Sequence, residues 1–236
     1  MTHRIKTSLL LSRRGVGAYL GSPLTYFSVA AFYFLVGWLF RTFIVATRTS
    51  DLAPFFDQVE FMLVLVVPVF TMRTVADELR TSSIDLLYIR GIRPVEIVTA
   101  KFVSSTAFVL AVLALPLGAA TTAMATLSKL DFGTVTAQLA GVALTAALLV
   151  ALGTATSALS ANPLAAAVIA SMVGLFAWFL DVADLSALWI QRVLALRLHL
   201  TSFAVGEVRL ADVVFFISLS AFFLVTAVAA LRVHRV

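Results

Sequence analysis

Long apolar stretches, separated by short polar segments, limit what this chain can fold into more than any other feature. About 20 apolar residues are enough for a helix to cross the hydrocarbon core of a bilayer. Because 61% of the 236 residues are hydrophobic and only 12% are charged, one soluble core could not enclose all the apolar side chains. The six apolar stretches cover about residues 24–44, 57–75, 102–127, 135–159, 164–180 and 213–231. The sequence therefore predicts an all-α, polytopic membrane protein with six transmembrane helices, which form a single domain over residues 1–236.

The distribution of basic residues predicts how these helices are oriented. Six spans place both termini on the same side, and Lys and Arg gather in the cytoplasmic segments of membrane proteins. If the termini are cytoplasmic, the segments on that side hold eleven of the 17 basic residues: Arg4, Lys6, Arg13, Arg14, Arg73, Arg80, Arg90, Arg93, Lys101, Arg232 and Arg235. We therefore expect an N-in, C-in topology. We attribute the net charge of +5 to this bias rather than to nucleic-acid binding.

No constellation typical of catalysis is present in the sequence. The chain has no cysteine and no glycine-rich phosphate loop of the GxxxxGK[ST] kind. Its histidines, His3, His199 and His234, do not stand at metal-ligand spacing. No charged residue lies near the middle of a predicted span, which argues against an ion-coupled transporter, a proton channel or an intramembrane enzyme. We expect no catalytic residue, metal ion or cofactor in this chain.

Two segments outside the spans are predicted to lie at the membrane surface. Residues 3–20 carry apolar side chains near helical spacing among Arg and Lys, which predicts a basic interfacial helix; a simple basic tail is the alternative. Residues 181–212 are too polar to span the membrane. They predict a re-entrant or interfacial helix pair on the outer side, anchored by Trp189 and Phe203. An ordinary extracellular loop is the alternative for this second segment.

The fourth predicted span, over 135–159, is rich in Gly, Ala and Ser. Small side chains let the backbones of neighbouring helices approach each other closely inside a membrane. We therefore expect this span to lie at the centre of the helix bundle.

Residues 73–101 form the one long polar segment between two predicted spans, and the predicted topology places this arm in the cytoplasm. A short helix is predicted within it, with Ser82 or Ser83 as the N-cap. Gly91 follows this helix as a left-handed residue that ends it. Pro94 is predicted to open the next helix, which continues through Lys101 into the third span.

The short helix of the arm has an apolar ridge made by Ile84, Leu87 and Tyr88. A short amphipathic helix displayed at the cytoplasmic face suits a groove on a partner protein. The alternative is that the helix lies on the membrane surface. Acidic residues flank the ridge and fit anionic lipid poorly, which favours a protein partner: Asp77, Glu78 and Asp85.

The arm resembles the cytoplasmic signature of the ABC-2 type transporter permeases. The resemblance is carried by Asp77-Glu78-x-Arg80, by Ser82-Ser83-Ile84-Asp85-Leu86-Leu87, and by Glu96-Ile97-Val98-x-x-Lys101-Phe102. Two positions depart from the family pattern, because Ser82 stands where the family usually has Gly and Gly91 where it usually has Pro.

The similarity runs over nearly the whole chain and is greatest to the gliding-motility and nitrous-oxide-reductase-maturation branch of that family. It includes Ser22-Pro23 before the first span, Phe55-Phe56, Pro68-x-x-Thr71-Met72-Arg73, and Gly206-Glu207-Val208-x-Leu210-x-Asp212 before the last span.

This resemblance implies a permease subunit of an ATP-binding-cassette transporter in the bacterial cytoplasmic (inner) membrane. Two separately encoded ABC ATPase subunits would bind ATP and Mg²⁺ and would drive export or translocation of a substrate that the sequence does not name. A second permease would complete a homodimer or heterodimer, and an extracytoplasmic accessory protein would join it. Residues 3–20 would be the elbow helix of the family, and residues 181–212 would border the exit.

The resemblance also implies the contacts with the ATPase. The coupling interface would comprise Asp77, Glu78, Ile84, Asp85, Leu86, Leu87 and Tyr88. Within it Asp77 and Glu78 would brace the arm, and Asn162 and Pro163 would make a second, smaller contact. A non-transporting membrane anchor, which transmits force or a signal from an ATPase to an extracytoplasmic partner, is the alternative function.

Overall fold

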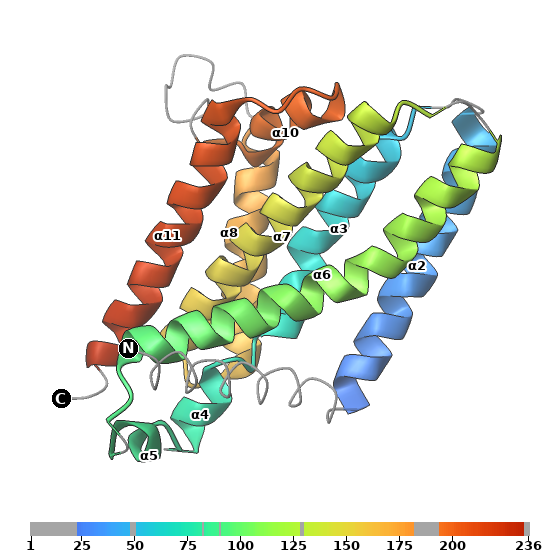
Figure 1. Cartoon of the computed structure of the whole chain (residues 1–236). Coiled ribbons are helices and arrows are strands. Elements are labelled where there is room, and N and C mark those ends of the chain that lie inside the picture. Colours follow the sequence, from blue (N-terminus) through green and yellow to red (C-terminus); the bar gives the residue numbers. More distant parts are fainter. Residues whose placement is uncertain are drawn as a thin grey trace.

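The computed structural model describes residues 23–47, 51–81, 83–89, 91–127, 130–181 and 194–233. Within these ranges every regular element is a helix, so the prediction of an all-α fold is confirmed for them (Figure 1). The helices are α2 (Pro23–Thr47), α3 (Ala53–Thr71), α4 (Ala76–Arg80), α5 (Ser83–Ile89), α6 (Pro94–Leu127), α7 (Phe132–Leu159), α8 (Pro163–Phe179), α10 (Leu196–Ala204) and α11 (Leu210–Val233). The predicted interfacial helix over 3–20 lies outside the described residues.

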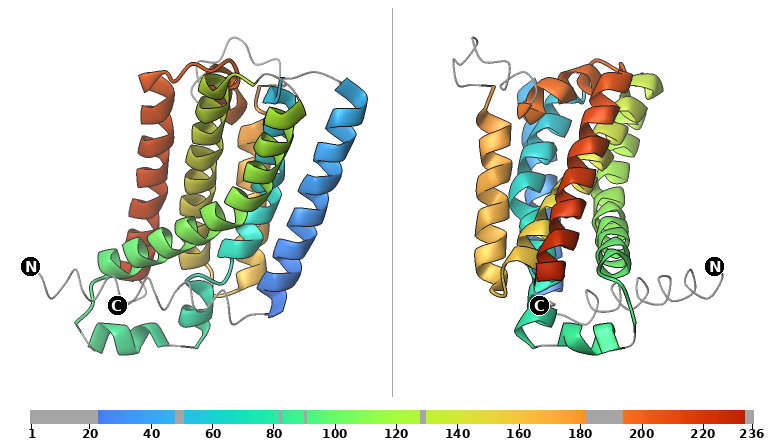
Figure 2. Two further views of the ribbon diagram at one scale, coloured as in Figure 1. Left: turned by 45° about the vertical axis from the view of Figure 1, so that its right-hand side comes forward. Right: turned by 90° about the vertical axis from the view of Figure 1, so that its left-hand side faces the viewer.

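The helices α2, α3, α6, α7, α8 and α11 run between the two ends of one bundle, and each runs antiparallel to the one before it (Figures 1 and 2). The short helices α4 and α5 lie beyond one end, which we call the arm end. The helix α10 lies at the opposite end, which we call the outer end. The start of α2 and the finish of α11 are both at the arm end.

Among the described residues, five stretches are long and apolar enough to cross a membrane: Thr25–Ala46, Ala53–Arg80, Pro94–Leu127, Phe132–Leu159 and Leu210–Val233. The remaining bundle helix, α8, has 17 residues. A helix of that length rises about 25 Å, against a hydrocarbon core of about 30 Å. The fold is thus compatible with a polytopic membrane protein, and α8 is shorter than the other bundle helices.

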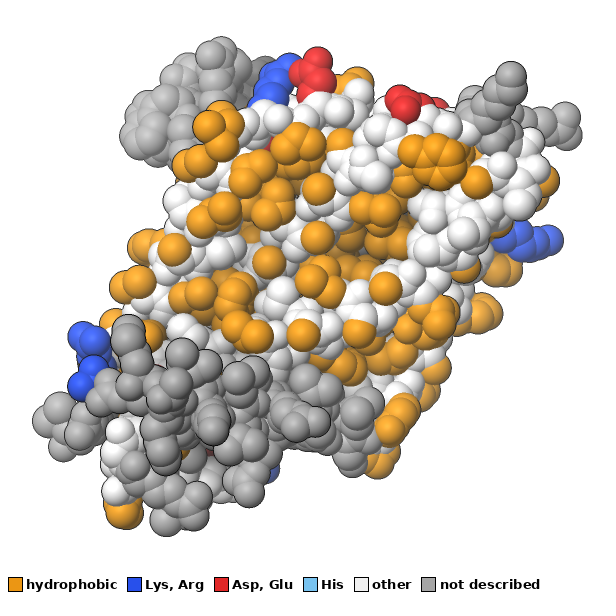
Figure 3. Space-filling view, viewed as in Figure 1, with side chains coloured by type: hydrophobic (Ala, Val, Ile, Leu, Met, Phe, Trp, Pro, Cys, Tyr) orange, Lys and Arg blue, Asp and Glu red, His pale blue; other side chains and the backbone are white. Residues whose placement is uncertain are grey.

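Large apolar side chains cover the sides of the bundle, where a soluble protein would carry polar groups. Figure 3 shows hydrophobic side chains spread along α6, α7 and α11. On α2 the exposed residues include Phe27, Phe34 and Trp38. Such a surface is stable in a bilayer, because the exposed apolar side chains then contact lipid tails instead of water.

The helix α7 lies at the centre of the bundle, as its small residues predict. It packs against α3, α6, α8, α10 and α11. Gly153 faces Thr71 of α3 so closely that an added Cβ would lie 2.8 Å from the Thr71 Cβ. Gly174 of α8 stands in the same relation to Val64, whose Cγ1 would lie 2.8 Å from an added Cβ. Only glycine leaves room for these two approaches.

The start of α3 differs from the sequence prediction. The helix begins at Ala53 rather than near Asp57, because Pro54 occupies the first turn, where a missing N–H does no harm. Glu60 stands near the start of the predicted span, whereas in α3 it is closer to the middle of the helix, and its side chain is buried. The expectation that the spans hold no charged residue near their middle is therefore wrong for α3 as it folds.

The predicted anchoring role of Phe203 is also wrong. Phe203 is only 1% exposed and belongs to the main apolar core, because the missing side chain of Gly141 lets it pack against α7. Its helix, α10, is further held to α11 by a contact of 2.7 Å between His199 Nδ1 and Asp212 Oδ1. The other predicted anchor, Trp189, lies outside the described residues.

Candidate functional site

Residues 73–101 form the site that the sequence singles out. In the structure they comprise a turn after α3, the helices α4 and α5, a second turn at Gly91, and the start of α6. Figure 2 shows α4 and α5 projecting beyond the arm end of the bundle. The predicted short helix is confirmed as α5, which begins at Ser83. Ser82 and Arg90 lie outside the described residues.

Ser157 of α7 fixes the start of the arm. Its hydroxyl accepts hydrogen bonds from the backbone N–H groups of Val75 at 3.0 Å and Ala76 at 2.9 Å. The same hydroxyl donates to the Met72 carbonyl at 3.0 Å. All three bonds are buried or partly buried, so one side chain satisfies three backbone groups that the turn between α3 and α4 would otherwise leave without partners. The arm is thereby attached to the central helix.

Glu78 of α4 forms an ion pair with Lys101 of α6. The Lys101 Nζ lies 2.6 Å from the Glu78 Oε1, and the two side chains are 24% and 26% exposed. Partial burial reduces screening by solvent, so this pair is stronger than a fully exposed one. The predicted bracing residue Glu78 thus connects the two sides of the arm. Asp77, the other predicted bracing residue, is more exposed and lies 4.0 Å from the Arg80 guanidinium.

Ile84 of α5 is buried against the chain's own bundle, at 4% exposure. It belongs to a small apolar cluster at the arm end, whose other members are Val75, Ile97, Val98, Ala155, Ala158, Ala227, Ala230 and Leu231. This cluster joins the arm to α6, α7 and α11. The side chain expected to dock in an ATPase groove therefore anchors α5 to the bundle in this conformation.

Tyr88 also faces the bundle, one turn after Ile84. Its hydroxyl donates a hydrogen bond of 3.0 Å to the Leu231 carbonyl, near the end of α11. The last four carbonyls of a helix have no partner within the helix, and Leu231 belongs to that group in α11. Tyr88 thus satisfies an otherwise unpaired acceptor and connects α5 to the last helix.

The opposite side of α5 presents Ile89, which is 82% exposed. It follows Ile84 by five positions, which places it about 140° around the helix. The sequence prediction did not include Ile89, although its helical spacing from Ile84 was a signal for it. Of the other predicted docking residues, Asp85, Leu86 and Leu87 lie on α5, and their side chains are outside what the structure describes.

Gly91 adopts a left-handed conformation with φ of +74°, as predicted. Its N–H donates to the Tyr88 carbonyl at 2.9 Å and so ends α5. Proline is restricted to φ near −65° and has no N–H to donate. Proline, which the ABC-2 type pattern usually has at this position, could therefore make neither the turn nor this hydrogen bond.

The helix α6 begins at Pro94, as predicted, and runs without a break to Leu127. Glu96 stabilises this start, because its Oε2 accepts a hydrogen bond of 3.0 Å from the Arg93 N–H. A force on the arm would therefore reach the bundle through a continuous helix.

The second predicted contact, at Asn162 and Pro163, lies at the arm end between α7 and α8 (Figure 2). Asn162 is the N-cap of α8, and its Oδ1 accepts a hydrogen bond of 3.0 Å from the Leu164 N–H. Pro163 occupies the first position of the helix, where its missing N–H is harmless. Both residues are thus explained by the start of α8.

No protein-family model and no curated protein sequence matches this chain. In the part of the chain that the structure describes, no group of three His, Cys, Asp or Glu residues could hold a metal ion. Function has to be inferred from the placement of the chain's own residues. The feature that most needs a functional explanation is the arm, because three of its contacts join it to three different helices of the bundle.

Proposed function

We propose that this chain is the membrane-spanning subunit of an ABC-2 type transporter and that its arm receives force from a separate ATPase. The observation that carries the proposal is the way the arm is held. Ser157 joins it to α7, Lys101 joins it to α6, and Tyr88 joins it to α11. A displacement of the arm would therefore move three bundle helices together as a rigid body.

In this proposal α2, α3, α6, α7, α8 and α11 are the six spans of an N-in, C-in protein of the bacterial cytoplasmic membrane. The arm end faces the cytoplasm and the outer end faces away from it. The length of α8 is at the lower limit for a span, and a local thinning of the bilayer would accommodate it.

The outward side of α5, which exposes Ile89, would contact the ATPase. Asp85, Leu86 and Leu87 remain the predicted docking residues of the family pattern, whereas Ile84 and Tyr88 would transmit the force into the bundle. Two ATPase subunits would bind ATP and Mg²⁺ and act on two permease arms, with a second copy of this chain or another permease completing the dimer.

The absence of cysteine from the sequence makes a direct test of this topology practical. A single cysteine at Ile89 tests the arm, and one at the exposed Val208 tests the outer end. In intact bacterial spheroplasts, a membrane-impermeant maleimide should label the Val208→Cys variant. It should label the Ile89→Cys variant only after the membrane is permeabilised. Labelling of both variants in intact spheroplasts would place the arm outside and overturn the proposal.

The same two variants test the partner. A photoactivatable thiol-reactive crosslinker at Ile89→Cys should capture a protein with a GxxxxGK[ST] phosphate loop in the native host. The same reagent at Val208→Cys should not capture it. Purified together, the two proteins should hydrolyse ATP, and the chain alone should not. ATP-dependent movement of a solute in reconstituted vesicles would then separate a transporter from a non-transporting anchor.

A further inference from the structure

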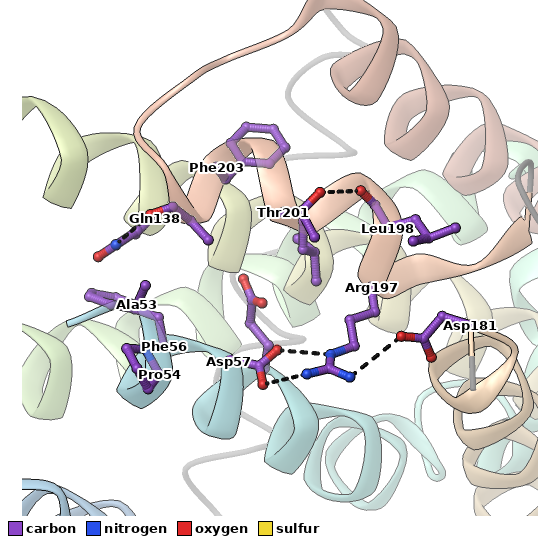
Figure 4. Close-up of a pocket in the computed structure, with 13 residues that line it drawn as sticks. Ala53, Pro54, Phe56, Asp57, Gln138, Asp181, Arg197, Leu198, Thr201 and Phe203 are labelled. Atoms are coloured by element: carbon purple, nitrogen blue, oxygen red, sulfur yellow. Dashed lines mark hydrogen bonds and ion pairs between the residues drawn. The ribbon is translucent and has the colours of Figure 1, made fainter. Parts of the chain in front are cut away.

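A cavity with apolar walls and a few polar side chains lies at the outer end of the bundle, far from the arm. It has a volume of about 420 Å³, is partly open, and is lined by residues of α3, α7 and α10 and by Asp181, which follows α8 (Figure 4). A cavity of this size is within the range of small-molecule sites. Its mouth is formed by Asp57, Asp181 and Arg197, whereas Glu60 and Gln138 line it from buried positions.

Arg197 brings two carboxylates together at the mouth. Its Nε lies 3.4 Å from the Asp57 Oδ1, and its Nη1 lies 3.4 Å from the Asp181 Oδ2. Figure 4 shows the guanidinium between these two groups. The positive charge of Arg197 is thus shared between two acids at the mouth, and neither of its ion pairs involves Glu60.

Glu60 is the unusual group in this cavity. Its side chain is 6% exposed, and among the described residues Glu60 takes part in no hydrogen bond and no ion pair. Its Oε1 lies beside Gly141 of α7, 3.4 Å from where a Cβ at that position would stand. A buried carboxylate without a partner is unfavourable, which is why such groups usually mark a binding function.

Gln138 supplies a second unsatisfied acceptor. Its Nε2 donates a hydrogen bond of 3.1 Å to the Ala204 carbonyl, which fixes the orientation of the amide. Its Oε1 is buried and accepts no hydrogen bond from any described residue. A buried amide oxygen without a donor also carries an energetic penalty, which a donor on a ligand would remove.

We infer that this cavity binds a small molecule or headgroup that carries a primary ammonium group. An ammonium offers three donors and no acceptor, which matches two buried acceptors that lack donors. Its charge would pair with Glu60, and Gln138 would accept a second hydrogen bond. The apolar walls, which include Phe56, Leu200 and Phe203, would hold the adjacent hydrocarbon part of the ligand.

This inference does not depend on the proposed coupling role, because the cavity and the arm are at opposite ends of the bundle. The ammonium could belong to a free amine or to the ethanolamine headgroup of a phospholipid, since both present the same –NH₃⁺ group. The two sources differ in whether the bilayer itself supplies the ligand, so binding measured in two lipid environments separates them.

The test measures binding of n-butylamine to the purified full chain by isothermal titration calorimetry in detergent. We expect saturable binding to the wild type and at least a tenfold loss of affinity in Glu60→Gln, which keeps the shape but removes the charge. Glu207→Gln is the matched control, because Glu207 pairs with Arg209 at 2.9 Å outside the cavity and its loss should leave binding unchanged. Thermal unfolding of each variant shows whether it is folded.

Two further probes define the chemistry. Butanol has the same hydrocarbon part without the charge and should bind at least tenfold more weakly. Equal affinity for butanol, or unchanged n-butylamine affinity in a folded Glu60→Gln variant, would overturn the inference. If Na⁺ or Mg²⁺ binds in the amine's place with higher affinity, the cavity is a metal site and the inference is likewise overturned.

Nanodiscs then identify the source of the amine. In phosphatidylcholine nanodiscs n-butylamine should bind as in detergent. If phosphatidylethanolamine nanodiscs reduce that affinity at least tenfold in the wild type, the lipid headgroup occupies the cavity. If they leave it unchanged, the natural ligand is a free amine. Either result supports an ammonium site. If n-butylamine binds in neither kind of nanodisc, the inference is contradicted.

Discussion

The hydroxyl of Ser157 accepts a hydrogen bond of 2.9 Å from the backbone N–H of Ala76, although 81 residues separate the two in the chain. This contact joins the first residue of α4 to the central helix of the bundle. Side-chain hydrogen bonds to the backbone are usually local, so a bond over this separation needs a specific tertiary arrangement. The position of the arm therefore depends directly on α7.

Replacing Ser157 with Ala should destabilise the protein by about 2 to 4 kcal/mol, because two buried backbone N–H groups lose their acceptor. Unfolding by sodium dodecyl sulfate in mixed micelles measures this change. Ser218→Ala is the matched control, since the Ser218 hydroxyl only donates to the Phe215 carbonyl within α11, at an exposed site. Equal stability of the two variants would show that Ser157 does not hold the arm.

The ion pair between Glu78 and Lys101 should be worth about 1 to 2 kcal/mol, between the values for exposed and buried pairs. The Lys101→Met variant leaves the Glu78 carboxylate without its cation and should lose that amount. The exchanged double variant, Glu78→Lys with Lys101→Glu, should recover most of it. A double-mutant cycle on unfolding free energies measures the coupling, and a coupling of zero would contradict the assignment.

Substitutions at Gly91 should show how much the turn after α5 depends on glycine. A left-handed φ costs a residue with a side chain about 1 to 2 kcal/mol, so Gly91→Ala should be destabilising by that amount. Gly91→Pro should be worse, because it also removes the N–H that bonds to Tyr88. Gly118→Ala is the control, since nothing lies within 4 Å of an added Cβ there and alanine suits a helix interior.

The helices of the bundle could be predicted from the sequence because their apolar stretches are long, and length alone excludes most other structures. The roles of Pro94 and Gly91 could also be predicted. Proline favours the first turn of a helix, and glycine favours the left-handed residue that ends one. The start of α3 could not be predicted from the apolar stretch, which begins only near residue 57, whereas Pro54 favours the first turn of a helix.

The contacts of the arm could not be predicted in the same way. The spacing of Ile84 and Tyr88 indicates that they share a face of α5, but a ridge on a short helix can face a partner or its own bundle. Tertiary packing decides whether the ridge faces a partner or the bundle, and in the structure both residues lie against the bundle. In the same way, Ser157 was one small residue among many in a span, and only the fold brings its hydroxyl to the turn.

Acidification should weaken the start of α7. The Thr134 hydroxyl and the Gly133 N–H both donate to Asp131, and these hydrogen bonds hold the pKa of its carboxyl below the usual value. A lowered pKa means that the stabilising contribution is complete above the ordinary pKa of Asp and is lost as the pH falls through the lowered one. The Asp131→Asn variant keeps an acceptor but does not titrate. Its unfolding midpoint should therefore depend less on pH below about 4 than that of the wild type.

The two isoleucines of α5 should behave in opposite ways. Ile84 is buried, so Ile84→Ala should destabilise the protein by about 2 to 4 kcal/mol through the cavity it leaves. Ile89 is exposed, so Ile89→Ala should change the unfolding free energy by less than about 0.5 kcal/mol.

In the complex with an ATPase that we propose, Ile89 should matter more than its small effect on stability suggests, because its exposed side chain would then lie in the interface. Ile89→Arg should leave the chain folded and in the membrane while it removes the ATPase activity that the chain stimulates. Unfolding titrations and ATPase assays on the same preparations measure both effects. Full stimulation by Ile89→Arg would show that the outward side of α5 does not contact the ATPase, even if Ile84 proves to be the anchor.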